Sequence, residues 1–264
     1  MSLPTDVLDV ILSFLQEDHT TLKACLESHP ILSQLAERYS YAHITVDENA
    51  TIESEIQFDV KLAVVLSRKP HIAKYVRSLE IKIGSYSFSQ DLPTILSSDS
   101  LPCLTTIALS SSGCVPGSIG WQSLPESFRV AFIASFNNLP SISSVSIVWI
   151  SGFPLSALNG CNKVKDLTLD GWSCRDGVNI TPEDVNGPLR LEALSIKHCD
   201  RQSLERLITW APTRHLRVLE LSRLDPCDCA KIPELLSKCS NSLTSLNVDL
   251  GTHCASHSLP RDLH

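Results

Sequence analysis

The chain has 264 residues, of which 43% are hydrophobic and 19% are charged, and its formal net charge at neutral pH is −7. This composition supports a folded core and excludes an intrinsically disordered chain, while the negative charge argues against a general binder of nucleic acid or anionic membrane. The longest apolar runs fall well short of the ~18 residues that a membrane-spanning helix needs.

The first forty residues are expected to form three short helices. Pro4 suits a first helical turn, and apolar residues follow it at helical spacing as far as Leu15. Asp18 can cap a second helix, and Pro30 opens a third. Because forty residues are too few to bury a core of their own, we expect these helices to pack on something else.

From residue 42 onward a repeated pattern dominates the sequence. A strand expected at 42–46 is followed by seven copies of apolar-x-x-apolar-x-apolar, whose fourth residues stand 22 to 38 residues apart. These fourth residues, all expected to be buried, are Leu79, Ile107, Val145, Leu167, Leu194, Leu219 and Leu246. Since side chains alternate along a strand, the pattern predicts one continuous parallel sheet. Apolar residues spaced three or four apart predict intervening helices at 59–67, 126–137, 202–210 and 230–237.

The ten cysteines are expected to be free and structural. The sequence has no CxxC pair, and Cys227 and Cys229, the closest two, lack the second half of a zinc site. The opening residues MSLPTDVLDV contain acids and no lysine or arginine, so we expect no secretory signal peptide. We therefore expect a cytoplasmic or nuclear location, where thiols stay reduced, and neither a bound metal nor a disulfide.

Four common motifs of enzymatic chemistry are missing from the sequence, which has no GxSxG, GxGxxG, P-loop or HExxH. The pairs His198-Cys199 and His253-Cys254 leave a catalytic Cys–His arrangement open, because such partners meet in space rather than in sequence. We interpret them as partly buried residues of the repeats. We therefore expect no enzymatic activity and no cofactor.

The repeated segments resemble leucine-rich repeats. Residues 191–199, LEALSIKHC, complete the LxxLxLxxC form, whereas the other copies vary at the last position. This irregularity is similar to the Cys-type repeats of ubiquitin-ligase receptors. The resemblance implies an α/β fold in which residues 41–264 form a leucine-rich-repeat solenoid with a parallel sheet.

Residues 3–15, LPTDVLDVILSFL, and 21–25, TLKAC, resemble an F-box. That family opens with Leu-Pro and continues with apolar pairs that end in Phe-Leu; its common Ser-Arg-x-Trp is replaced here by residues 27–32, ESHPIL. The resemblance implies a three-helix F-box-like domain at 1–40 that binds a Skp-type adaptor and, through it, a cullin. The residues implied in adaptor binding are Leu3, Pro4, Val7, Leu8, Ile11, Leu12, Leu15, Leu22 and Leu26. A helical cap that covers the first repeat is the alternative interpretation.

The outward positions of the predicted strands carry five acids and two lysines, so this face suits a basic or polar protein partner. An ordinary solvated surface would look the same. Trp149 and Trp172 end adjacent strands, where packing is the favoured role, although tryptophan is also frequent among binding hot spots. The candidates for substrate contact are Glu80, Lys82, Asp166, Asp170, Lys197, Glu220, Asp249, Trp149 and Trp172.

The F-box resemblance implies a substrate-recognition subunit of a Skp–cullin–F-box E3 ubiquitin ligase. The helices would dock the adaptor, and the repeats would hold a substrate protein. A repeat-based scaffold or inhibitor without a ubiquitin link stays open, as does a hydrolase with unrecognised catalytic residues.

Overall fold

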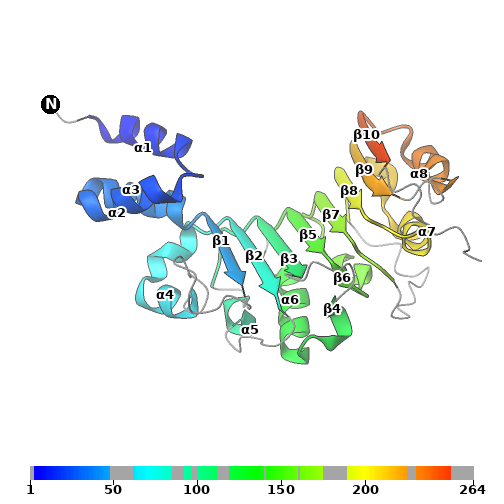
Figure 1. Ribbon diagram of the computed structural model, residues 1–264, viewed down its shortest axis with the longest axis horizontal. Helices are drawn as coiled ribbons and strands as arrows, with labels where there is room; N and C mark the ends of the chain where they lie inside the picture. Colours follow the sequence, from blue (N-terminus) through cyan, green and yellow to red (C-terminus); the bar gives the residue numbers. More distant parts are fainter. Residues whose placement is uncertain are drawn as a thin grey trace, which may run out of the picture. The chain divides into compact units, whose positions relative to one another are not determined.

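A computed structural model describes residues 3–47, 62–84, 92–96, 100–111, 119–139, 141–159, 161–174, 189–224 and 230–250. These residues form a mixed α/β structure with eight α-helices and ten strands (Figure 1). Eight strands form a mostly parallel, open sheet in the order β1-β2-β3-β5-β7-β8-β9-β10, and β4 pairs with β6. None of the described helices combines the length and the apolar character needed to cross a bilayer.

The contacts between residues group the chain into two compact units. The first contains Met1–Cys114 and Leu124–Val145, and the second contains Val115–Ser123 and Ser146–His264. The boundary predicted after residue 40 falls inside the first unit and stays a prediction.

The three predicted N-terminal helices are present as α1 (Thr5–Phe14), α2 (His19–Ser28) and α3 (Pro30–Ser40). Pro4 is the N-cap residue of α1, and the Asp18 carboxylate accepts a hydrogen bond from the Thr21 backbone N–H at 3.0 Å. Contrary to expectation, the helices do bury a small core among themselves. That core consists of Leu12, Leu22, Leu35 and Ala36, with partly buried apolar side chains around it. Three helices around so small a core leave much of α1 uncovered.

The rest of the first unit begins the parallel sheet. Its strands are β1 (His43–Asp47), β2 (Ser78–Ile83) and β3 (Thr106–Ser111), and its helices are α4 (Leu62–Arg68), η2 (Pro70–Lys74), α5 (Leu92–Ile95) and α6 (Glu126–Asn138). Strand β2 pairs in parallel with both β1 and β3. The strand predicted at 42–46 is confirmed as β1, and the helix predicted at 126–137 is confirmed as α6. The helix predicted at 59–67 overlaps α4, and its residues 59–61 lie outside the described residues.

A buried carboxylate joins α3 to the segment that leads into β2. Glu37 accepts hydrogen bonds from Lys69 Nζ at 2.7 Å and from His71 Nε2 at 3.0 Å. Burial by itself would raise the pKa of Glu37, but the hydrogen bonds from Lys69 and His71 outweigh it and hold the pKa below its ordinary value. The helical segment is thus fixed to the start of the repeats by a charged contact as well as by the chain.

The second unit continues the alternation of strands and helices. Its strands are β4 (Ile119–Gly120), β6 (Ile150–Ser151), β7 (Asp166–Asp170), β8 (Ala193–Lys197), β9 (Val218–Leu224) and β10 (Ser245–Leu250), and its helical segments are η3 (Trp121–Ser123), η4 (Leu155–Leu158), α7 (Arg201–Trp210), η6 (Thr213–His215) and α8 (Ile232–Cys239). Strand β5 (Ser144–Val148) crosses the division between the units. Strands β7, β8, β9 and β10 pair in parallel, which confirms this part of the predicted ladder. The helices predicted at 202–210 and 230–237 correspond to α7 and α8.

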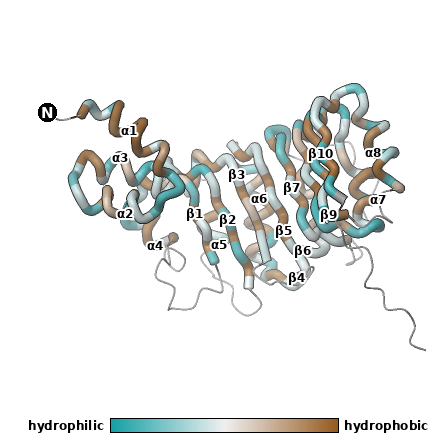
Figure 2. Tube along the Cα trace, turned by 45° about the horizontal axis from the view of Figure 1, so that its top comes forward, coloured by the Kyte–Doolittle hydropathy of each residue, from teal (hydrophilic) through white to brown (hydrophobic). Residues whose placement is uncertain are grey.

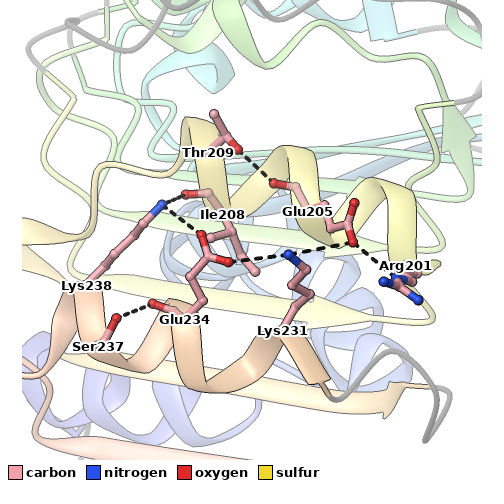
Figure 3. Close-up of polar contacts among 8 residues, drawn as sticks. All are labelled: Arg201, Glu205, Ile208, Thr209, Lys231, Glu234, Ser237 and Lys238. Carbon is pink, nitrogen blue, oxygen red and sulfur yellow. Dashed lines mark hydrogen bonds and ion pairs between the residues drawn. The ribbon is translucent and has the colours of Figure 1, made fainter.

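Helices α7 and α8 lie together on one side of β9 and β10 (Figure 1), and a polar network joins them (Figure 3). Lys231, just before α8, lies 3.9 Å from Glu205 Oε1 of α7 and 3.6 Å from Glu234 Oε2 of α8. Lys238 Nζ donates to the Ile208 carbonyl at 3.0 Å. Carbonyls in the last turn of a helix have no partner within that helix, so Lys238 supplies one for α7. This contact helps to hold α8 on α7.

Hydrophobic and hydrophilic residues alternate along the strands, as Figure 2 shows by colour. Six of the seven positions expected to be buried are buried: Leu79, Ile107, Val145, Leu167, Leu194 and Leu219. The prediction was wrong for Leu246, which is 46% exposed, and Val248 on the same strand is also exposed. Strand β10 is last in the strand order, so its side chains have a described strand on one side only.

The described cysteines, which are Cys25, Cys103, Cys161, Cys174, Cys199 and Cys239, are free thiols. Burial raises the pKa of Cys161 to about 11, which keeps that thiol protonated and unreactive. Within the described ranges no three potential metal ligands gather in one place. Cys227 and Cys229 lie outside the described residues, so the expectation for them stays a prediction.

Candidate functional site

One side of α1 is an exposed apolar surface. Leu12 points into the small helical core, whereas Val7, Val10, Ile11 and Phe14 are exposed, with Phe14 reaching 83%. Leu3, just before the helix, is exposed as well. We call these five exposed residues the α1 surface. Apolar side chains gathered on so small a helical unit are characteristic of an interface.

The residues implied in adaptor binding fall into three groups. Leu3, Pro4, Val7 and Ile11 are exposed, and Leu8, Leu15 and Leu26 are partly buried against the helical core. Leu12 and Leu22 are fully buried, so they support the α1 surface from beneath rather than contribute to it. Val10 and Phe14 belong to the surface although they were not predicted as part of it. The apolar residues of α1 lie on nearly all sides of the helix, so sequence periodicity could not tell which side packs.

A second candidate site lies where strands β5, β7, β8 and β9 approach their carboxyl ends. Three residues other than glycine have a left-handed backbone there: Trp149 (φ 58°), His198 (φ 48°) and Arg223 (φ 54°). Gly171 (φ 61°) occupies the equivalent position after β7. Each of these residues stands two positions after the last apolar residue of its repeat. The same left-handed conformation therefore recurs at four successive strands. It places four equivalent residues along the carboxyl ends of these strands.

Backbone hydrogen bonds hold these turns in register. The Trp149 N–H donates to the Asp170 carbonyl at 2.7 Å, and the Gly171 N–H donates to the Lys197 carbonyl at 2.9 Å. The His198 N–H donates to the Ser222 carbonyl at 3.3 Å. The ladder of the sheet thus extends through the left-handed residues, so their side chains start from fixed points.

The Trp149 ring lies over Gly171 and next to His198. A Cβ at Gly171 would overlap the six-membered ring of Trp149, so only glycine fits there. The ring centroids of Trp149 and His198 are 4.8 Å apart. Trp149 therefore forms an aromatic wall beside the imidazole of His198.

His198 joins two opposite charges. Its Nδ1 lies 2.7 Å from Asp170 Oδ1, and its Nε2 lies 3.4 Å from Arg223 Nη1. Because a guanidinium can only donate, Nε2 is the acceptor and Nδ1 carries the proton that is donated to Asp170. The nitrogen that would act as a general base in catalysis is thus occupied by Arg223. The arrangement orients His198 as part of a binding surface.

A second internal pairing lies beside the first. Ser195 Oγ donates to Glu220 Oε2 at 2.7 Å, and Lys197 Nζ lies 3.2 Å from Glu220 Oε1. The hydrogen bond from Ser195, together with Lys197, holds the pKa of Glu220 below its ordinary value. Glu220 is therefore ionised and already paired at neutral pH.

Lys197, His198 and Glu220 lie among the residues that line a hollow of about 390 Å³, which we call the strand-end hollow. Its residues come from β7 to β10 and from the turns after these strands: Asp170, Lys197, His198, Glu220, Ser222, Arg223, Asn247 and Asp249. The parallel register explains the gathering, because Asp170, Lys197, Ser222 and Asp249 stand side by side on four strands. Residues more than twenty positions apart in sequence thereby meet.

The structure brings together four of the nine predicted substrate-contact residues, namely Asp170, Lys197, Glu220 and Asp249, with Trp149 next to them. Trp172 is buried, and its Nε1 donates to the Phe153 carbonyl at 3.2 Å, so it is a core residue. Asp166 begins β7, at the opposite end of that strand from the hollow. Asp166 is exposed, but the protein displaces part of the solvent around its carboxyl, and this, together with the nearby Glu192, raises its pKa.

Glu80 and Lys82 belong to the first unit, away from the strand-end hollow. They pair with each other at 3.7 Å, and Thr45 donates to Glu80 at 3.2 Å. These two residues are therefore not part of the hollow, and their role in substrate contact stays a prediction.

His198 and Arg223 were not predicted as binding residues, although both are central to the hollow. The available signal was their register, two positions after the last apolar residue of the repeat. Polar or aromatic residues there stand at the end of a strand and can meet their counterparts in neighbouring repeats. Comparison with known proteins adds no family to this geometry: no protein-family model matches the sequence, and no curated protein matches it.

Proposed function

We propose that the chain is a substrate-recognition subunit of a Skp–cullin–F-box E3 ubiquitin ligase. The N-terminal helices bind a Skp-type adaptor and through it a cullin. Residues 41–264, as a leucine-rich-repeat solenoid, bind a substrate protein. Such a subunit carries out no bond chemistry itself. It raises the local concentration of substrate next to the ubiquitin carrier.

The α1 surface is the observation that carries this proposal. An F-box needs helices that pack among themselves and still present apolar side chains to a partner. Helix α1 meets both requirements, because Leu12 is buried in the helical core while Val10 and Phe14 are exposed. A plain cap for the first repeat would need only the packed side.

The adaptor test is a substitution of Val10 by Asp, which places a carboxylate in the α1 surface. We expect Val10→Asp to abolish capture of a Skp-type adaptor, because binding would bury an unpaired charge at a cost of several kcal/mol. The measurement is a pull-down of purified adaptor by the full chain. Circular dichroism should show an unchanged fold, since Val10 is 57% exposed.

Val130 provides the matched control. It is a valine on helix α6, 61% exposed, so Val130→Asp makes the same chemical change at the same degree of exposure outside α1. We expect Val130→Asp to capture adaptor as well as wild type does. Adaptor capture that survives Val10→Asp, or wild-type chain that captures none, would contradict the ligase proposal.

The strand-end hollow by itself is also compatible with a repeat-based scaffold or inhibitor without a ubiquitin link. The hollow and the α1 surface lie in different units. A chain that binds a protein partner through the hollow but captures no adaptor would favour this second function.

A further inference from the structure

The strand-end hollow has one more carboxylate than it has cationic side chains. Lys197 is paired with Glu220, and Arg223 is linked to Asp170 through His198. Asp249 lines the same hollow from β10 and is exposed, and it has neither an ion pair nor a hydrogen bond with a described residue. Two cations, Lys197 and Arg223, thus stand with three carboxylates, Asp170, Glu220 and Asp249, so the hollow carries one negative charge in excess.

The polar residues around Asp249 are compatible with the same kind of visitor. Asn247 stands two residues earlier on the outward side of β10, and Ser222 is the register partner of Asp249 on β9. An amide oxygen, a hydroxyl and a carboxylate can all accept hydrogen bonds from an ammonium or guanidinium group. An anionic ligand would instead meet Asp249 as an unfavourable like charge.

The length of the site indicates what carries the cation. Trp149 comes directly after β5, and β5, β7, β8, β9 and β10 are neighbours in the strand order. At about 4.8 Å between strands, the row from the backbone of Trp149 to that of Asp249 measures roughly 19 Å. An extended polypeptide rises about 3.3 Å per residue, so about six residues span this row. A small molecule would occupy only part of it.

We infer that the strand-end hollow binds an extended segment of a partner protein, about six residues long, with a lysine or arginine side chain placed against Asp249. The other end of the segment lies against the aromatic wall of Trp149. The inference rests on the proposed function only in naming this segment as part of the ligase substrate. The net charge of −7 favours the approach of a basic segment over longer distances.

The test uses the full chain and three pools of fluorescein-labelled hexapeptides. Each pool is random except at one position, which holds Lys in the first pool, Gln in the second and Glu in the third. Fluorescence anisotropy gives the affinity for each pool. We expect wild type to bind the Lys pool about fivefold more tightly than the Gln pool, at the upper end for an exposed ion pair, and the Glu pool least tightly. Added salt should reduce the preference.

Two variants locate the preference. Asp249→Asn removes the charge from an exposed residue and should bind the Lys and Gln pools equally. Asp166→Asn makes the same change on an exposed aspartate at the far end of β7 and should keep the fivefold preference. Equal binding of the Lys and Gln pools by wild type, or a preference that survives Asp249→Asn, would overturn the inference.

Adaptor capture by the same proteins separates this inference from the ligase proposal. Asp249→Asn should capture adaptor normally, because the α1 surface is unchanged. Wild type that prefers the Lys pool but captures no adaptor would support the basic-segment site and overturn the ligase role. Wild type that captures adaptor but shows no Lys preference would support the ligase role and overturn the basic-segment site.

Discussion

At the scale of single residues, the left-handed residues at the carboxyl ends of the strands are the most unusual feature of the described chain. Trp149, His198 and Arg223 all have positive φ, although such a backbone costs roughly 1–3 kcal/mol for residues other than glycine. Strain of this kind persists where surrounding structure holds it, and it is common at ligand-binding sites. Here the extended hydrogen-bond ladder holds it, and the side chains it presents form the strand-end hollow.

Gly171 offers a direct test of this arrangement. A Cβ there would strain a left-handed backbone and overlap the Trp149 ring. We expect Gly171→Ala to lower the free energy of unfolding by ~1–3 kcal/mol. Urea unfolding followed by circular dichroism measures the change.

The double variant Gly171→Ala/Trp149→Ala distinguishes overlap from backbone strain. Removing the ring removes the overlap, so the cost of Gly171→Ala should be smaller in the Trp149→Ala background than in wild type. Equal costs in the two backgrounds would show that the ring does not lie on Gly171.

At the scale of elements, polar contacts fix helices to other segments of the chain. Lys238 ties α8 to the end of α7, and Glu37 ties α3 to Lys69 and His71 ahead of β2. These contacts join elements that are separate in sequence. For the N-terminal helices, the Glu37 contact sets how α3 meets the first strands of its own unit.

Glu37 should make stability depend on pH. Its pKa in the folded chain lies below the ordinary value of 4.5, so its contribution is fully present above the unfolded pKa and is lost as pH falls through the folded pKa. Glu37→Gln should therefore cost about 1 kcal/mol near pH 7 and progressively less in acid. Urea unfolding at several pH values between 7 and 3 measures this convergence.

Glu27 supplies the control for this experiment. It is an exposed glutamate on α2, and Glu27→Gln should leave the unfolding free energy close to that of wild type throughout the pH range. If Glu37→Gln stayed equally destabilised at pH 3 and pH 7, the carboxylate would not be the source of the effect.

At the scale of the whole molecule, the buried position of each repeat forms a recurring apolar core. Leu79, Ile107, Leu167, Leu194 and Leu219 are buried in successive or neighbouring repeats, whereas Leu246 on the last strand is not. Being on an end strand is not enough to expose this position, because Ile44 on β1, at the other end of the strand order, is buried. The energy of an equivalent leucine should therefore depend on how well its own surroundings cover it.

Truncation of two equivalent leucines tests this dependence. Leu194, on β8, is 2% exposed, and Leu194→Ala should cost ~2–5 kcal/mol by removing buried apolar surface and leaving a cavity. Leu246→Ala, at the same register position on β10, should cost less than about 1 kcal/mol. Urea unfolding measures both values. Similar costs at the two sites would mean that Leu246 is as well covered in solution as Leu194.

The amino-acid pattern alone determined the strands of the long sheet, most of the longer helices and which residues are buried in most repeats, although it did not predict β4, β6 or α5. The apolar spacing of residues 191–196 recurs in seven segments, and it reflects strand geometry that acts within a few residues. The helix starts marked by Pro4, Asp18 and Pro30 are equally local. Local geometry is readable from sequence because the interacting groups are close along the chain.

Only the tertiary structure decided which of these residues act together. Parallel pairing brought Asp170, Lys197 and Asp249 into one row, and left-handed turns added His198 and Arg223. Asp249 is the carboxylate without a described partner, and only the distances among these side chains could show this. Tertiary packing likewise left Leu246 exposed on an end strand while burying Ile44 on the other, and helix packing chose which side of α1 is exposed. Periodicity alone does not determine these outcomes, because each depends on a neighbour that is distant in sequence.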